Sequence, residues 1–426
     1  MRETLRSVAS LLLSYGLLLL ANGLFGTLLG VRTKLEGFST EVIGVIMAAY
    51  FFGILMGAIF GVRVVVAVGH IRAFATFASL MSVTALVHVL LINPLAWGLM
   101  RVVSGFCMAG MIMVTESWLN ERATNETRGQ VLSFYMIVNF AAAGFGQFLL
   151  PLADPGQFQL FSVASIIFSL AVVPVLMTRS SAPLPLEPQP LRLRELYRVS
   201  PLGFVGACCA GMVNSSFYGL GPVFAQGLGL TLAGTSTFMA SVILGGLVLQ
   251  WPVGRLSDRV DRRWILAGIA IATSASCLGI VAISQGEHSG LYLAGVIYGG
   301  LAFTVYSVSV AHANDYARPD QLVQTASGLL IAYGVGATTG PILAATLMGR
   351  LGPSGLFLFS TAITAFLGLF AFYRMTRRPP KVRDEQGPYV ALPGAQFSSE
   401  ELYATTLKQM SDEQAAQPAA RQNENR

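Results

Sequence analysis

The sequence predicts an all-α membrane protein with twelve transmembrane helices in two pseudo-symmetric six-helix bundles. Of its 426 residues, 54% are hydrophobic and only 11% are charged, and the mean hydropathy is +0.63, whereas soluble domains carry about 25% charged residues. The apolar residues form runs long enough to cross a bilayer, and the two halves of the chain resemble each other. This composition excludes a soluble enzyme and a disordered chain.

Twelve apolar stretches approach the roughly 20 residues that a spanning helix needs. In chain order they cover residues 8–30, 41–62, 72–92, 95–118, 129–151, 158–178, 201–224, 232–254, 264–284, 290–312, 322–348 and 354–373. The first stretch follows basic residues, as a signal peptide does, but it is too long for one and eleven more spans follow.

Two polar segments interrupt or end this series. Residues 179–200 are rich in Pro and Arg and predict a linker between two bundles, residues 1–178 and 201–373. Residues 374–426 form a polar tail in which Ser398 and Glu401 fit a helix-capping box, although the composition favours a disordered extension.

The distribution of basic residues predicts the orientation in the membrane. With the N-terminus inside, 23 of the 27 Lys and Arg residues lie in inside segments and three, Arg32, Lys34 and Arg350, lie outside. Positively charged loops stay cytoplasmic, so we expect both termini and the linker in the cytoplasm. The scatter of these charges between apolar runs argues against a nucleic-acid partner.

The two halves share a register at an offset of 192 to 194 residues. The matching pairs are Asn22 with Asn214, Gly61 with Gly254, Asn120 with Asn314, Glu121 with Asp315, and Gly146 with Gly340. Parallel repeats of this kind place a solute site between the two halves, opened to each side in turn by rocking.

The string GRLSDRVDRR, residues 254–263, lies in the inside loop after the eighth span. Gly254 allows two helix ends to approach, and Asp258 can accept from a helix N-terminus or pair with Arg259 and Arg262. Together with Arg263 these residues could latch the inner ends of two helices. The alternative is that the arginines only anchor the loop inside.

This loop resembles the G-x-L-x-D-R-x-x-R-R signature of the major facilitator superfamily. RVVSGFCMAG, residues 101–110, fits a second pattern of that superfamily, and ESWLN with YMIVN resembles its YcaD-like branch of bacterial inner-membrane transporters. The resemblance covers roughly residues 8–373 and implies a carrier of a small solute, working by alternating access. In the first half, Val65 and Val66 replace the expected Asp and Arg, so that latch is degraded.

Arg101 is the one basic residue well inside the hydrocarbon region, where an Arg costs about 2.5–3.5 kcal/mol. Its repeat-related position is Gly295. We expect Arg101 to serve substrate binding or coupling; the alternative is a structural Arg bonded to backbone carbonyls.

Glu116 lies 15 residues after Arg101 on the same span, roughly 22 Å away along a helix. Both residues can face one cavity. If protons drive transport, Glu116 is the expected coupling residue, since no carboxylate lies nearer the midplane. A facilitator or exchanger remains open, and so does a plain ion pair of Glu116 with Arg122 or Arg128.

In this superfamily spans one, four, seven and ten line the cavity. The resemblance therefore implies a polar lining of Asn22, Arg101, Asn214, Ser215, Tyr218, Tyr298 and Tyr306, with Tyr50, Asn139 and Tyr333 on neighbouring spans. Such a neutral-to-cationic cavity with aromatic walls suits a small polar or anionic organic solute.

Glycine patterns in two spans indicate close helix packing: Gly53, Gly57 and Gly61 on the second span, and residues 334–345 on the eleventh.

Two rival functions remain open, an intramembrane enzyme and a channel or lipid-handling protein on the same scaffold. We find no HExxH, GxSxG or Walker sequence. The four cysteines sit in apolar runs without metal-ligand spacing. We expect a monomer in the bilayer that needs no cofactor or metal.

Overall fold

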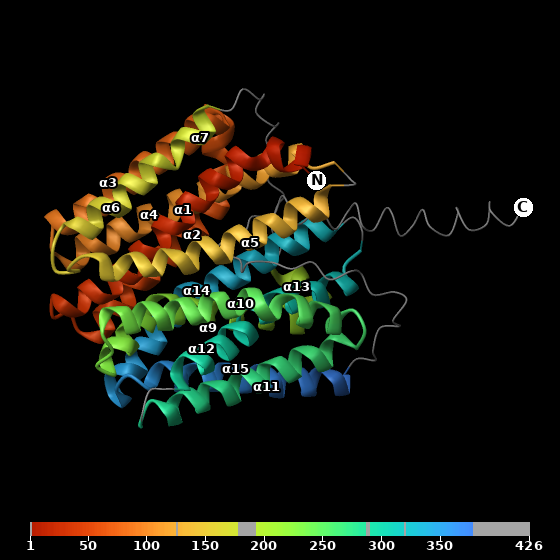
Figure 1. The fold of residues 1–426 in the computed structure, drawn as a ribbon. Helices are drawn as coiled ribbons and strands as arrows, with labels where there is room; N and C mark the ends of the chain where they lie inside the picture. The colour runs from red at the N-terminus through yellow and green to blue at the C-terminus, as the bar shows by residue number, and fades with distance from the viewer. Residues whose placement is uncertain (1, 125–126, 178–192, 287–289, 319–320, 378–426) are drawn as a thin grey trace, which may run out of the picture.

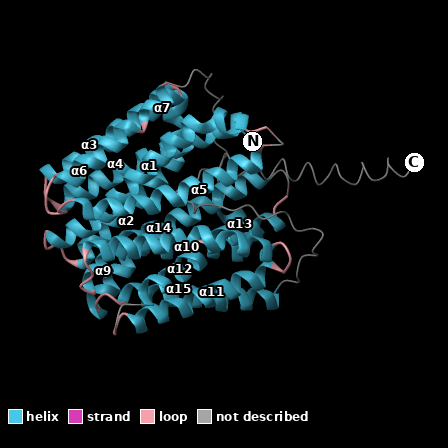
Figure 2. Cartoon of the chain, viewed as in Figure 1, coloured by secondary structure: helices cyan, strands magenta, loops and turns pink. Residues whose placement is uncertain are grey.

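The computed structural model describes residues 2–124, 127–177, 193–286, 290–318 and 321–377. Within these ranges every regular element is a helix (Figure 2). Most of the predicted linker and the tail from residue 378 onward, with its capping box, lie outside them.

The first half contains six spans made of seven α-helices and one 3₁₀ helix. In chain order they are α1 (Arg2–Leu35), α2 (Thr40–Val68), α3 (His70–Leu90), α4 (Pro94–Arg122), α5 (Arg128–Gly146) with η1 (Gln147–Leu152), and α6 (Gln159–Leu170) with α7 (Val172–Leu176).

The second half begins with a short helix and then repeats the pattern. Its elements are α8 (Leu193–Val199), α9 (Pro201–Gly227), α10 (Leu232–Ser257), α11 (Arg262–Ile283), α12 (Leu291–Ala302) with α13 (Thr304–Tyr316), α14 (Leu322–Leu351) and α15 (Gly355–Arg377). Eleven helical segments are long and apolar enough to span a membrane, and the twelfth is α9, which follows α8 after a bend of 116°. The predicted twelve-span, all-α fold is confirmed.

Several helices differ from the predicted spans in detail. Most run past the apolar stretch, because polar residues at their ends continue the helix; α1 reaches 34 residues. The fifth span finishes in a 3₁₀ turn that contains Pro151, and the tenth breaks at Phe303. Inside the predicted linker, α8 forms a turn whose buried Leu196 packs against Gly328 of α14.

The two sets of spans lie side by side (Figure 1), with α1–α7 in red to yellow above and α9–α15 in green to blue below. They meet where α2 packs against α14, α1 against α9, and α5 with η1 against α10. At the α2–α14 seam a Cβ on Gly44 would lie 2.3 Å from the Cβ of Ala345 and 2.8 Å from the carbonyl oxygen of Pro341. Only glycine allows the halves to approach this closely.

Candidate functional site

A cavity lies between the two halves and is walled by both. Its lining comes from α1, α2, α4, α5 and η1 in the first half and from α9 and α10 in the second, and it holds about 490 Å³ of space not filled by atoms. Half of the lining residues are small or apolar. The polar half consists of Asn22, Thr27, Tyr50, Arg101, Gln147 and Tyr218, with no carboxylate among them.

Arg101 dominates the electrostatics of this cavity. Its side chain is buried, with 4% of the residue exposed. The guanidinium carbon lies over the Tyr50 ring, 3.9 Å from its centroid, a cation–π arrangement. Its Nε and Nη1 atoms are shielded from solvent and have no hydrogen-bond partner in the described part of the chain. These two nitrogens therefore make no hydrogen bonds to backbone carbonyls, which was the structural alternative that the sequence left open.

Close helix packing brings Tyr50 and Arg101 together. On α2, a Cβ at Gly53 would lie 2.1 Å from the carbonyl oxygen of Val102, and on α4 a Cβ at Gly105 would lie 2.0 Å from that of Tyr50. Gly57 likewise faces Ala109. The predicted packing role of the α2 glycines is thus confirmed at Gly53 and Gly57, and it holds the two helix backbones in contact at the site.

The other polar wall residues are tied to one another. Tyr50 donates to the amide oxygen of Asn22 at 3.0 Å. Thr27 donates to Oε1 of Gln147 at 2.5 Å, while Nε2 of Gln147 donates to two backbone carbonyls at 3.1 and 3.2 Å. Gln147 is therefore fully bonded, whereas Asn22 uses only its oxygen.

The remaining predicted lining residues lie away from this wall, inside the second half. Asn214 and Ser215 are buried on α9, and Ser215 donates to the carbonyl of Met212. The Tyr298 ring is fully buried and packs edge-on against Phe357, with 5.2 Å between centroids. Tyr306 contacts the ring of Tyr333 at 5.0 Å. Of the seven predicted residues, the cavity thus brings together Asn22, Arg101 and Tyr218.

Glu116 lies in a separate polar cluster within the first half. It is fully buried and accepts a hydrogen bond from Tyr135 of α5. Tyr15 of α1 donates to Tyr135 at 3.0 Å, and Asn139 donates to Tyr15. The Tyr15 and Tyr135 rings also stack, with 4.7 Å between centroids. Four side chains from three spans therefore form one hydrogen-bonded chain that ends on a carboxylate.

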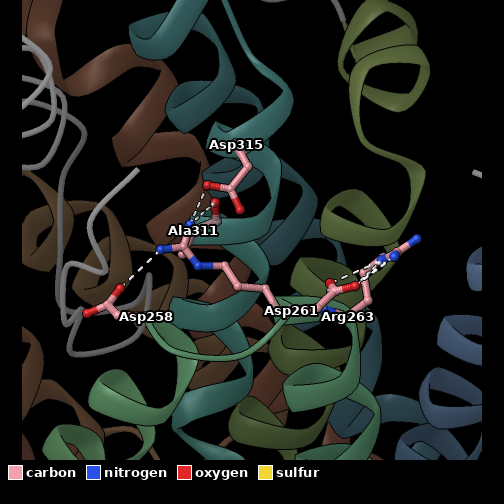
Figure 3. Close-up of polar contacts among 6 residues, drawn as sticks. Asp258, Asp261, Arg263, Ala311 and Asp315 are labelled. Carbon is pink, nitrogen blue, oxygen red and sulfur yellow. Dashed lines mark hydrogen bonds and ion pairs between the residues drawn. The ribbon is translucent and has the colours of Figure 1, made fainter. Parts of the chain in front are cut away.

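The loop between α10 and α11 forms an ion-pair cluster centred on Arg262 (Figure 3). Arg262 is 1% exposed and donates to Asp258 at 3.2 Å, to the carbonyl oxygen of Ala311 at 3.1 Å, and to the buried Asp315. Asp315 and Ala311 belong to α13, so Arg262 joins the start of α11 to the end of the tenth span. Asp258, at 44% exposure, is the more solvated partner.

The other residues of this loop take different places from those expected. Asp261, not Asp258, caps α11 by accepting from the backbone of Arg263, whose side chain also pairs with it at 2.6 Å. Partial burial alone would raise the pKa of the Asp261 carboxyl, but the hydrogen bonds from Arg263 outweigh burial and hold that pKa below its ordinary value. Gly254 is buried in the last turn of α10, and Arg259 is exposed in the turn that follows.

Sequence reasoning missed the roles of Thr27, Gln147, Tyr135 and Asp315. Tyr135 and Asn139 are four residues apart and therefore lie on one face of a helix, which could have marked that face of the fifth span as polar. Asp315 aligns with Glu121 in the internal repeat. Its contact with Arg262 could not be predicted from that alignment, because it depends on how α11 packs against α13.

Comparison with known proteins agrees with this architecture. The family model of the Major Facilitator Superfamily matches residues 11–330 and, in a second match, residues 236–410. An uncharacterized MFS-type transporter of Yersinia pestis is 28% identical over 386 residues, covering 90% of this chain and 98% of its own. The MFS-type transporter YcaD of Escherichia coli is 28% identical over 378 residues, covering 88% and 97%.

Two solved structures share the fold. The nucleoside transporter NupG superposes with a TM-score of 0.71 at 13% identity, over 87% of this chain and 99% of that one. A D-xylose–proton symporter superposes with a TM-score of 0.70 at 12% identity, over 86% and 97%. With twelve spans, a cavity between two halves and a family match over most of its length, the chain belongs to the major facilitator superfamily.

Proposed function

We propose that this transporter carries a small organic solute across a bacterial inner membrane by alternating access, with the cavity around Arg101 as its solute site. The observation that carries the proposal is that both halves contribute to the walls of one cavity that contains a buried guanidinium. Rocking of residues 1–178 against residues 201–373 would open such a site to either side.

The clusters outside the cavity fit two supporting roles. The Arg262 cluster joins two spans at the inner end of the second half and serves as a latch, with Gly254, Asp258, Arg259 and Arg263 in the same loop. Glu116, if protons drive transport, is the coupling residue, because taking up a proton cancels a charge that is costly in the membrane.

Counterflow in proteoliposomes tests the proposal directly. Vesicles preloaded with unlabelled solute should take up labelled solute against its gradient, saturably, and Arg101→Ala should abolish this uptake in protein that still purifies as a single species. Uptake that rises linearly without saturation and shows no counterflow would identify a channel instead. A thermal-shift screen of metabolites and drugs supplies the solute to be labelled.

The coupling role of Glu116 is tested in the same vesicles under an imposed pH gradient. Glu116→Gln should keep counterflow, which needs no net proton movement, and lose gradient-driven accumulation. Tyr135→Phe is the matched variant, since it removes the hydrogen bond to Glu116 and keeps the ring. Accumulation that survives Glu116→Gln removes Glu116 from the coupling mechanism.

The orientation is tested by reporter fusions at Leu196 and after the C-terminus. Both should report the cytoplasm, from the excess of Arg and Lys in the inside segments. A periplasmic signal at either position would contradict the proposed topology.

A further inference from the structure

We propose that the cavity selects an organic anion of about one negative charge, such as a carboxylate, and that Arg101 and Asn22 donate hydrogen bonds to its oxygens. The inference rests on the proposed function, since it names the solute class of that same cavity. It comes from the hydrogen-bond inventory of the site.

Arg101 differs from the other buried arginines of the described residues. Arg32 pairs with Glu36 at 2.6 Å and donates to the carbonyl of Pro155 at 3.0 Å. Arg262 pairs with two aspartates, and Arg263 with Asp261. All four are at most 7% exposed. The fold thus supplies carboxylates to three buried guanidiniums and only an aromatic face to Arg101.

The cavity offers donors and few competing acceptors. Nε and Nη1 of Arg101 have no partner in the described chain, and the amide NH₂ of Asn22 is left over after its oxygen accepts from Tyr50. Thr27 and Gln147 satisfy each other and the backbone. Since a buried donor without an acceptor is costly, the complementary solute is rich in acceptors.

Charge narrows the solute class further. A guanidinium without a carboxylate in the wall repels a cationic solute and gains most from one anionic group. A neutral solute would leave the buried charge uncompensated. The cavity between the two halves is small, so the solute is a small organic acid.

Tyr50 gives the site a defined geometry. Its ring lies under the guanidinium while its hydroxyl bonds to Asn22, so one side chain orients both donor groups. The ring holds Arg101 by one face only, which leaves the N–H groups along the guanidinium edge for a planar acceptor pair.

The first experiment compares matched solutes on the purified protein. The panel consists of carboxylic acids of two to ten carbons, their primary amides, and their amine counterparts, each tested by thermal shift. Only carboxylates should stabilise the parent protein, and the best of them should show counterflow. The anion assignment would be overturned if an amide stabilised the protein as much as its acid does, or if no acid stabilised it. Saturable counterflow of any other solute would still leave the transport proposal standing.

The second experiment uses variants of Arg101 with a matched control. Arg101→Lys should weaken binding of the best acid by at least about tenfold, because Lys lacks the planar fork, and Arg101→Met should remove the ligand shift. Arg32→Gln, at an arginine already paired, should keep the binding of the parent protein.

A structural role for Arg101 predicts a different result. Without solute, Arg101→Met should melt at or above the temperature of the parent, since it removes an uncompensated buried charge. A clear loss of melting temperature in ligand-free Arg101→Met, or retained binding of the acid, would contradict the proposal.

Discussion

The α2–α3 connection of the first half and the α10–α11 connection of the second half are built on the same plan with different chemistry. α3 begins at His70 and α11 begins at Arg262, at positions related by the repeat. His70 contacts Ser117 of α4 at 3.2 Å, and Arg262 contacts Ala311 of α13. Each contacted residue lies five positions before the last residue of its helix. The first half thus keeps the connection but makes it with a single imidazole–hydroxyl hydrogen bond.

The residues that precede α11 and α3 also differ, and again the second half has the stronger polar interaction. α11 starts after Asp261, whose side chain caps the helix and pairs with Arg263, whereas α3 starts after Gly69, which has a φ of 85° and no side chain to cap with. His70 instead stacks on Trp118, with 6.3 Å between ring centroids. The contact between the two spans is therefore kept in the first half although the Asp and Arg of the signature are absent, and it rests on fewer polar interactions there.

The largest effect is expected from Arg262→Gln. It removes the ion pair with the buried Asp315, and breaking a buried pair typically costs about 3–5 kcal/mol. Melting temperature in detergent should fall strongly and counterflow should be lost. Arg72→Gln, at an exposed arginine on α3, is the control and should behave as the parent. If Arg262→Gln melted at the temperature of the parent, the ion pairs of Arg262 would contribute no more stability than the hydrogen bond of His70 does in the first half.

Asp258→Asn should have a smaller and more selective effect. Asp258 is the exposed partner of Arg262, and exposed pairs contribute roughly 0–1 kcal/mol. We expect a lower exchange rate with unchanged expression and solute affinity, measured by counterflow kinetics and a binding titration. Exchange at the parental rate would show that Asp315 alone carries the latch.

His70→Ala should weaken the contact between α3 and α4 by less than Arg262→Gln weakens the contact between α11 and α13. It removes one neutral hydrogen bond, which contributes about 1 kcal/mol, and the stacking on Trp118. His70→Asn retains a polar group and should recover part of the loss in melting temperature. If His70→Ala destabilises the protein more than Arg262→Gln, the ranking of the two latches is reversed.

The smallest effect is expected from Asp261→Asn, and it should depend on pH. The folded-state pKa of Asp261 is lowered, so the carboxylate contributes stability above its unfolded pKa of about 3.9 and loses that contribution as the pH falls through its lower folded pKa. The melting temperatures of parent and variant should differ at pH 7 and converge toward pH 3. A constant difference across this range would assign the effect to capping geometry instead of charge.

The spans and the close helix contacts could be predicted because they follow from apolar length and glycine spacing. Arg101 also stood out, since any charge at that depth demands an explanation. The break at Phe303 could not be predicted, because neither Pro nor Gly occupies it and neighbouring Thr304 bonds to the carbonyl of Leu301 only in the folded helix.

The wall of the cavity was only partly predictable. The resemblance, which implies that spans one, four, seven and ten line the cavity, identified Asn22, Arg101 and Tyr218. Gln147 reaches the site through the 3₁₀ turn that ends the fifth span. Tyr298 has the polarity of a lining residue, yet phenylalanines surround it inside the second half. The rotation of each helix about its axis decides such cases, and it depends on packing between helices distant in sequence.

Gly44 has a further consequence at the seam between α2 and α14. Because the two halves touch there without room for a methyl group, a substitution at Gly44 would change the energy of this contact and, with it, the balance between the two access states of the proposed mechanism. Each 1.4 kcal/mol of added contact energy changes that balance about tenfold. In the proposed mechanism, the preference of the carrier for one side of the membrane would therefore be adjustable at a position outside the cavity lining, while every proposed binding residue stays the same.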